Sequence, residues 1–161
     1  MKKIIIAFLL LLSALKMFGQ EQPITYINLH FSHSLRIPYK TVDIEVVKRK
    51  SEVVLFLTSK PANEDSKWDY SNKSEEYKIS DQEFNNLLDQ LEKINTKDIA
   101  QHFGEFTLDS YSTTITFGGI SNKISYTLGS LIKEEDSSLK YYMSLCKDLL
   151  VLAQLDPDEI L

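Results

Sequence analysis

The sequence predicts an α+β fold: an antiparallel sheet of about five to six strands with two helices packed on one face, in the order β-β-β-(β)-α-β-β-α. Short runs in which apolar and polar residues alternate are typical of strands with one buried face. Two longer segments, 80–94 and 137–154, instead carry apolar residues at helical spacing. Short connections between the strand runs favour antiparallel pairing, and each helix has one apolar face to bury against the sheet.

The first two strands follow from simple alternation. Within 24–35, the apolar residues Ile27, Leu29 and Phe31 are separated by polar ones. Residues 42–46 alternate in the same way. Each segment therefore predicts a strand that buries one face.

The third strand and the segment after it differ from this pattern. Residues 53–57 are all apolar, which predicts an interior strand that is buried on both faces. From 58 to 76 the chain is polar, so we expect a long loop there. A short extended piece at 77–79 leads to the first helix.

The first helix has a clear start. Ser80 and Glu83 have the spacing of a capping box, in which each side chain accepts a hydrogen bond from a free backbone N–H. The apolar stripe of this helix consists of Phe84, Leu87, Leu88, Leu91 and Ile94.

A second hairpin and a last helix complete the chain. Apolar and polar residues alternate again within 114–128, around a turn at Gly118-Gly119 that residues 120–122 could lengthen. The last helix, over about 137–154, carries Cys146 on its apolar stripe, and we expect Pro157 to mark its end.

Residues 1–19 have the composition of a signal peptide. Lysines at the start precede an apolar run at 4–15, which is shorter than the roughly 20 residues that cross a bilayer. Gly19 suits the residue before the cleavage site, although Met17 fits the small-x-small pattern poorly; an uncleaved N-terminal anchor is the alternative. We therefore expect a single α+β domain over 20–161, exported to the periplasm or the cell exterior, with no stable membrane anchor after cleavage.

The charge of the chain argues against some partners. Without residues 1–19, which hold three lysines and no acidic residue, 15 basic and 23 acidic side chains remain, a net charge of −8. This charge repels phosphate backbones and anionic lipids, so nucleic acid is not an expected partner. The negative net charge weakly favours basic proteins as partners.

The residue types that carry chemistry do not form a recognisable site. His30 and His33 would point to opposite faces of a strand, and no sequence feature brings His102 near them. Cys146 would be buried and inert. Ser-x-x-Lys spacings occur, but the companion motifs of serine enzymes are absent. We therefore predict no catalytic residue, no metal site and no cofactor.

The strongest candidate for a binding surface is the polar segment 59–76. It contains Trp68 and Tyr70, which are typical interface residues, flanked by Lys67 and Asp69. In the alternative, the tryptophan folds back to cap the edge of the sheet. The polar face of the first strand, with Tyr26 and His30, is the next candidate surface.

These observations favour an exported, non-enzymatic binding protein of the inhibitor or immunity type, whose partner is a protein or a small ligand outside the cytoplasm. One alternative is an envelope-associated hydrolase, whose pocket should gather His30, His102 and a carboxylate. Another is a structural accessory of an envelope complex.

Overall fold

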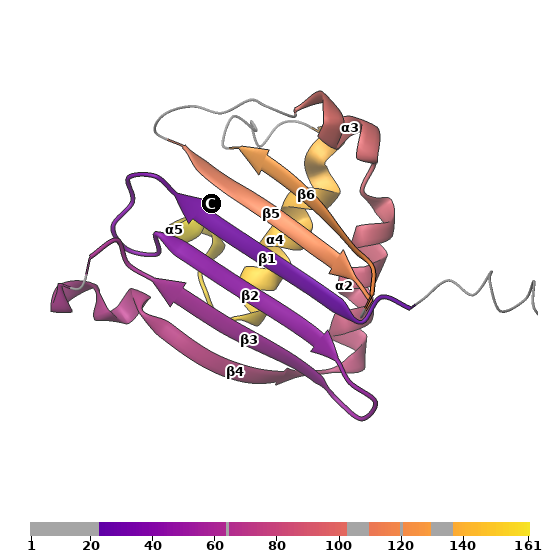
Figure 1. Cartoon of the computed structure of the whole chain (residues 1–161), viewed down its shortest axis with the longest axis horizontal. Coiled ribbons are helices and arrows are strands. Elements are labelled where there is room, and N and C mark those ends of the chain that lie inside the picture. Colours follow the sequence, from indigo (N-terminus) through magenta and orange to yellow (C-terminus); the bar gives the residue numbers. More distant parts are fainter. Residues whose placement is uncertain (1–22, 64, 103–109, 120, 130–136) are drawn as a thin grey trace, which may run out of the picture.

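A single antiparallel sheet forms the frame of the molecule. The computed structural model describes residues 23–63, 65–102, 110–119, 121–129 and 137–161, so the expected signal peptide lies outside the described residues. The six strands lie in the spatial order β4-β3-β2-β1-β5-β6 (Figure 1). In chain order they are β1 Tyr26–His33, β2 Thr41–Lys48, β3 Val53–Lys60, β4 Lys73–Ile79, β5 Tyr111–Gly118 and β6 Lys123–Gly129.

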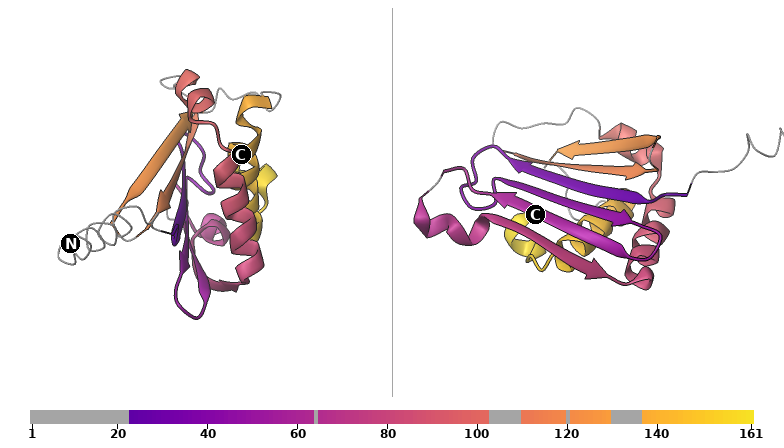
Figure 2. Two further views of the ribbon diagram at one scale, coloured as in Figure 1. Left: turned by 90° about the vertical axis from the view of Figure 1, so that its right-hand side faces the viewer. Right: turned by 60° about the horizontal axis from the view of Figure 1, so that its bottom comes forward.

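The two long helices, α2 and α4, pack against each other and cover one face of the sheet, as Figure 2 shows. The opposite face carries no helix in the described part of the chain. The predicted α+β class, with helices on one face of an antiparallel sheet, is confirmed. The helical segments are η1 Ser66–Ser71, α2 Asp81–Lys93, α3 Thr96–Gln101, η2 Ser137–Leu139, α4 Lys140–Leu152 and α5 Pro157–Ile160.

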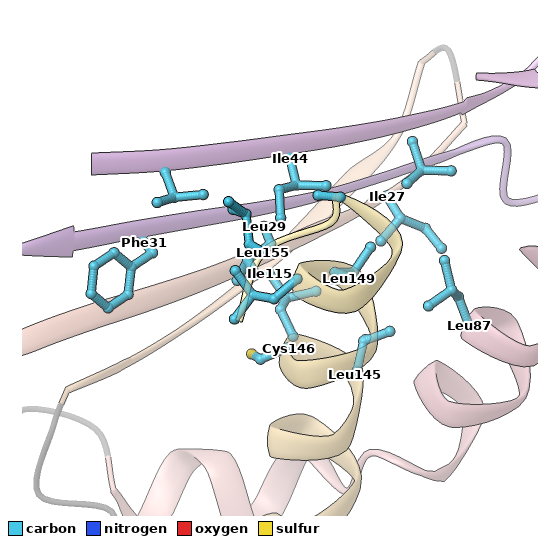
Figure 3. Packing of buried hydrophobic residues seen from close by; sticks show 14 of the residues in the cluster. Ile27, Leu29, Phe31, Ile44, Leu87, Ile115, Leu145, Cys146, Leu149 and Leu155 are labelled. Atoms are coloured by element: carbon cyan, nitrogen blue, oxygen red, sulfur yellow. The ribbon is translucent and has the colours of Figure 1, made fainter. Parts of the chain in front are cut away.

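The core lies between the sheet and these helices. Ile27, Leu29 and Phe31 of β1 are fully buried and face α4, whose Leu145 and Leu149 are also fully buried (Figure 3). Burying one such side chain contributes about 1.5–3 kcal/mol to folding. The alternation of apolar residues along β1 therefore fixes which face of the sheet meets the helices.

The capping box at the start of α2 is confirmed. The hydroxyl oxygen of Ser80 accepts a hydrogen bond from the backbone N–H of Glu83 at 3.1 Å. The Glu83 carboxylate accepts one from the backbone N–H of Ser80 at 2.6 Å. These two bonds fix the point at which the chain leaves β4 and enters the helix layer.

The turn between β5 and β6 requires a glycine at its first position. Gly118 has φ +152°, and a Cβ atom added there would overlap the carbonyl oxygen of Asn122. The backbone N–H of Gly119 donates to that same oxygen at 3.0 Å. The connection spans 119–122, which is the longer of the two turns that the sequence allows.

The prediction of a long loop over 58–76 is wrong. Strand β3 continues to Lys60, β4 begins at Lys73, and η1 lies between them. Within β4 only Tyr77 and Ile79 are apolar and pack against the core, whereas residues 73–76 are polar, so the first half of the strand shows no apolar alternation in the sequence.

The last helix ends close to where the sequence predicts. Helix α4 ends at Leu152, and Pro157 follows as the first residue of the short helix α5, after the cap residue Asp156. Proline suits the first position of a helix because the N–H that it lacks has no partner there. Three acidic residues precede the helix predicted at about 137–154, where they would oppose the positive end of its dipole. They are Glu134, Glu135 and Asp136, and they lie outside the described residues.

Cys146 is fully buried on α4, and this burial raises the pKa of its thiol. We expect Cys146→Ala to lower the free energy of unfolding by about 1–2 kcal/mol through lost packing. Urea denaturation measures the change. A thiol reagent should label the native protein slowly and the urea-unfolded protein fully; rapid labelling of the native protein would contradict the burial.

Candidate functional site

Exposed apolar side chains gather at one end of the sheet. The β1–β2 connection carries Leu35 and Ile37, which are 65% and 37% exposed, and η1 carries Tyr70, which is 52% exposed. These are three of the six large apolar side chains that are exposed in the described part of the chain, so half of those side chains lie here. We call this surface, with Tyr39 and Trp68, the aromatic end.

Two contacts hold the aromatic end together. The backbone N–H of Ala62, which precedes η1, donates to the carbonyl oxygen of Ile37 at 2.8 Å. The rings of Tyr39 and Tyr70 meet edge to face, with 6.0 Å between their centroids and 78° between their planes. The β1–β2 connection and η1 therefore form one surface, which lies at the same end of the sheet in Figure 1.

Tyr39 supports the exposed ring of Tyr70. Its backbone is left-handed, with φ 51°, and its side chain is only 6% exposed. Burial is the main cause that raises the pKa of its hydroxyl. A left-handed conformation costs a non-glycine residue about 1–2 kcal/mol. Tyr39, whose ring contacts that of Tyr70, therefore has a strained backbone.

Trp68 is half-buried. Its ring lies 6.2 Å from that of Tyr70. The Nε1 atom is covered, and no described residue offers it an acceptor. Trp68 therefore packs within η1 and also forms part of the aromatic end.

Buried hydroxyl groups attach η1 to β3. The Ser59 hydroxyl donates to the carbonyl oxygen of Ser71 at 2.8 Å, and the Ser71 hydroxyl donates to that of Trp68 at 2.8 Å. The Asp65 carboxylate caps η1 by accepting from the backbone N–H of Lys67 at 3.2 Å. These hydrogen bonds fix η1 against the end of β3.

The other two predicted residues lie at its rim. The Lys67 ammonium lies 5.2 Å from the centroid of the Trp68 ring and 3.4 Å from the Asp65 carboxylate. Asp69 is exposed. The four predicted residues thus share one short segment, of which Tyr70 is the exposed anchor.

The chain matches no protein-family model and no curated protein. Among the described residues, no helix is both long and apolar enough to cross a membrane. Any functional conclusion therefore depends on the geometry of this surface.

Sequence reasoning missed the residues of the aromatic end that precede β2. Tyr39 meets Tyr70 across the fold, and neither alternation nor a motif signals such a contact. The only local signal is the pair of apolar residues Leu35 and Ile37 in a segment that otherwise resembles a turn.

Unpaired lysines surround the aromatic end. Lys40, Lys60 and Lys73 make no ion pair with any described residue, and all three lie where β2, β3 and β4 begin or end near this surface. At the opposite end of the sheet the cations have carboxylate partners: Lys48 pairs with Asp81, and both Arg49 and Lys78 pair with Glu52. Acidic groups lie at the aromatic end as well: besides burial, Glu159 and Glu75 raise the pKa of Tyr39, and Asp65 and Asp69 belong to η1 and its cap, so this surface carries charges of both signs.

The open face of the sheet is the second candidate surface, and its polar groups largely bond to one another. His30 Nδ1 lies 2.7 Å from Asp43 Oδ1. The Asn28 amide donates to the carbonyl oxygen of Ile44 at 3.2 Å. Burial and the neighbouring Glu45 carboxylate raise the pKa of Tyr26. A face whose polar groups are satisfied internally offers fewer groups to a ligand.

The histidines do not assemble a site. His30 pairs with Asp43, whereas His33 Nδ1 accepts from the backbone N–H groups of Leu35 and Arg36. His102 lies at the C-terminal end of α3. In the described part of the chain no three His, Cys, Asp or Glu side chains come close enough to hold a metal ion.

Proposed function

We propose that this chain is an exported, non-enzymatic binding protein that engages another protein through its aromatic end, in the manner of an inhibitor or immunity protein. The observation that carries the proposal is the position of Tyr70: its ring is 52% exposed yet rests on the buried ring of Tyr39. An exposed aromatic ring that is already fixed loses little conformational freedom on binding.

The surroundings of Tyr70 support a protein partner. Leu35 and Ile37 extend the apolar area, and aromatic anchors within such patches carry much of the energy of protein interfaces. Lys40, Lys60 and Lys73, together with the exposed Asp65 and Asp69, offer charges of both signs to a partner surface.

Site-specific crosslinking tests the proposal. A photoreactive phenylalanine analogue replaces Tyr70 in the native host, and a second variant carries the same analogue at Tyr141, which is 39% exposed on α4. Crosslinks to a defined protein at position 70 and their absence at position 141 would support the aromatic end as the interface. No crosslink from position 70, or equal crosslinking from both positions, would refute it.

Export is tested at the N-terminus. We expect the mature protein to begin at Gln20, since Gly19 fits the residue before cleavage. N-terminal sequencing of protein from the periplasmic and culture fractions of the host checks this. A chain that still begins at Met1 and sediments with membranes would show that the N-terminus is an anchor.

A further inference from the structure

Strand β4 forms a bare edge of the sheet. It is the last strand in the sheet order and pairs only with β3 (Figure 1). No described element lies beyond its outer side in Figure 1. The N–H and C=O groups along that side can pair with another strand.

The edge carries charges in a specific order. Over seven residues, β4 holds Lys73, Glu75, Glu76 and Lys78. Glu76 and Lys78 are both exposed and, two positions apart, share the open face of the sheet. Charges of this kind disfavour pairing with arbitrary strands, because residues directly opposite each other interact strongly.

We propose that β4 pairs antiparallel with β4 of a second copy of this chain, joining the two sheets into one. In a symmetric antiparallel pair, each residue faces its counterpart across a two-fold axis that is perpendicular to the sheet. The proposed register places Tyr77 opposite the partner's Tyr77. Glu76 then lies opposite the partner's Lys78, and the symmetry creates this ion pair twice.

Three neighbouring registers bring like charges together. Centring the pair on Glu76 or on Glu75 places two carboxylates opposite each other, and centring it on Lys78 opposes two ammonium groups. Side chains must also stay on their own faces, which excludes shifts by a single residue. Charge therefore selects against these three registers and favours the one centred on Tyr77.

One other register also matches opposite charges. Centring on Ser74 places Lys73 opposite the partner's Glu75, but it overlaps the strands only over residues 73–75, whereas the Tyr77 register overlaps them over 75–79. The longer overlap makes more backbone hydrogen bonds. Glu75 also accepts a hydrogen bond from the Tyr77 hydroxyl within its own strand.

Charge exchange tests the proposal. Sedimentation velocity on the mature chain over about 5–500 μM, the range in which small interfaces associate, should show a monomer–dimer equilibrium. We expect Glu76→Lys to weaken the dimer at least about tenfold, because it turns two attractions into two repulsions. Lys78→Glu should weaken it as well, but it also removes the ion pair that Lys78 forms at 3.0 Å with Glu52 of its own chain. The double exchange Glu76→Lys with Lys78→Glu should restore the dimer.

Three controls separate the proposed strand contact from general effects of charge and from unfolding. Lys50→Glu changes an exposed cation in the β2–β3 turn and should leave the dimer intact. Glu75→Lys should have a smaller effect than Glu76→Lys if the Tyr77 register is correct. Thermal melting confirms that each variant is folded.

Several outcomes would overturn the proposal: a monomer at every concentration, a dimer that Glu76→Lys leaves unchanged, or a double exchange that fails to restore association. A dimer that is lost in Tyr70→Ala and kept in Glu76→Lys would place the contact at the aromatic end instead. The proposed function is tested separately by the crosslinks from position 70.

Discussion

In the Tyr70→Ala variant, the affinity for the partner that crosslinks from position 70 should fall about thirtyfold, which corresponds to about 2 kcal/mol of binding free energy. The ring is exposed and lies above Tyr39, so its removal leaves little cavity in the core. The free energy of unfolding should therefore change by less than about 0.5 kcal/mol. Titration calorimetry and urea denaturation measure the two quantities.

Two matched variants sharpen this result. Tyr141→Ala removes another exposed ring, remote from the aromatic end on α4, and should leave binding unchanged. Trp68→Ala should weaken binding and also lower the free energy of unfolding by about 1–2 kcal/mol, because Trp68 is half-buried. Unchanged binding in Tyr70→Ala would place the interface elsewhere, with the open face around Tyr26, Asn28 and His30 as the next surface to examine.

Removal of the Tyr142 side chain should have the largest effect on stability. Tyr142 is 1% exposed, and its hydroxyl, which donates to the carbonyl oxygen of Thr113 at 2.9 Å, joins α4 to β5. Tyr142→Ala leaves a large cavity at this junction and should lower the free energy of unfolding by about 3–5 kcal/mol. Urea denaturation of the mature chain measures the loss.

The neighbouring variants separate packing from hydrogen bonding. Tyr142→Phe keeps the ring but removes the donor to Thr113, so it should cost about 1–2 kcal/mol. The adjacent variant Tyr141→Ala should cost less than about 0.5 kcal/mol, since that ring is 39% exposed. Equal losses in Tyr141→Ala and Tyr142→Ala would contradict the burial of Tyr142.

Elements that bury one face could be predicted from the sequence. The alternation of Ile27, Leu29 and Phe31 and the capping box of Ser80 with Glu83 each report a local constraint, and the structure has both. Of strand β4 the sequence indicated only the short extended piece at 77–79, because residues 73–76 are polar and lie at the edge of the sheet. Its strand conformation depends on pairing with β3, which is a property of the whole fold.

The candidate site was only partly predictable for the same reason. Trp68 and Tyr70 stand out by residue type, and their segment was identified. The role of Tyr39 depends on a contact with a residue far along the chain, and its left-handed backbone gives no sequence signal when the residue is a tyrosine. Sequence could therefore indicate the anchors of the surface but not the residue that supports them.

The strand order also has a kinetic consequence. Strand β1 lies in the middle of the sheet, between its sequence neighbour β2 and the distant β5, so that Leu29 is adjacent to both Ile44 and Ile115. The meander β1–β4 is local, and α2 follows it directly, but its apolar face is fully covered only when α4, near the C-terminus, packs beside α2. Long-range pairing of this kind forms slowly, because a large loop must be ordered first. The search for the β1–β5 register, rather than the formation of any single strand or helix, should therefore set the folding rate.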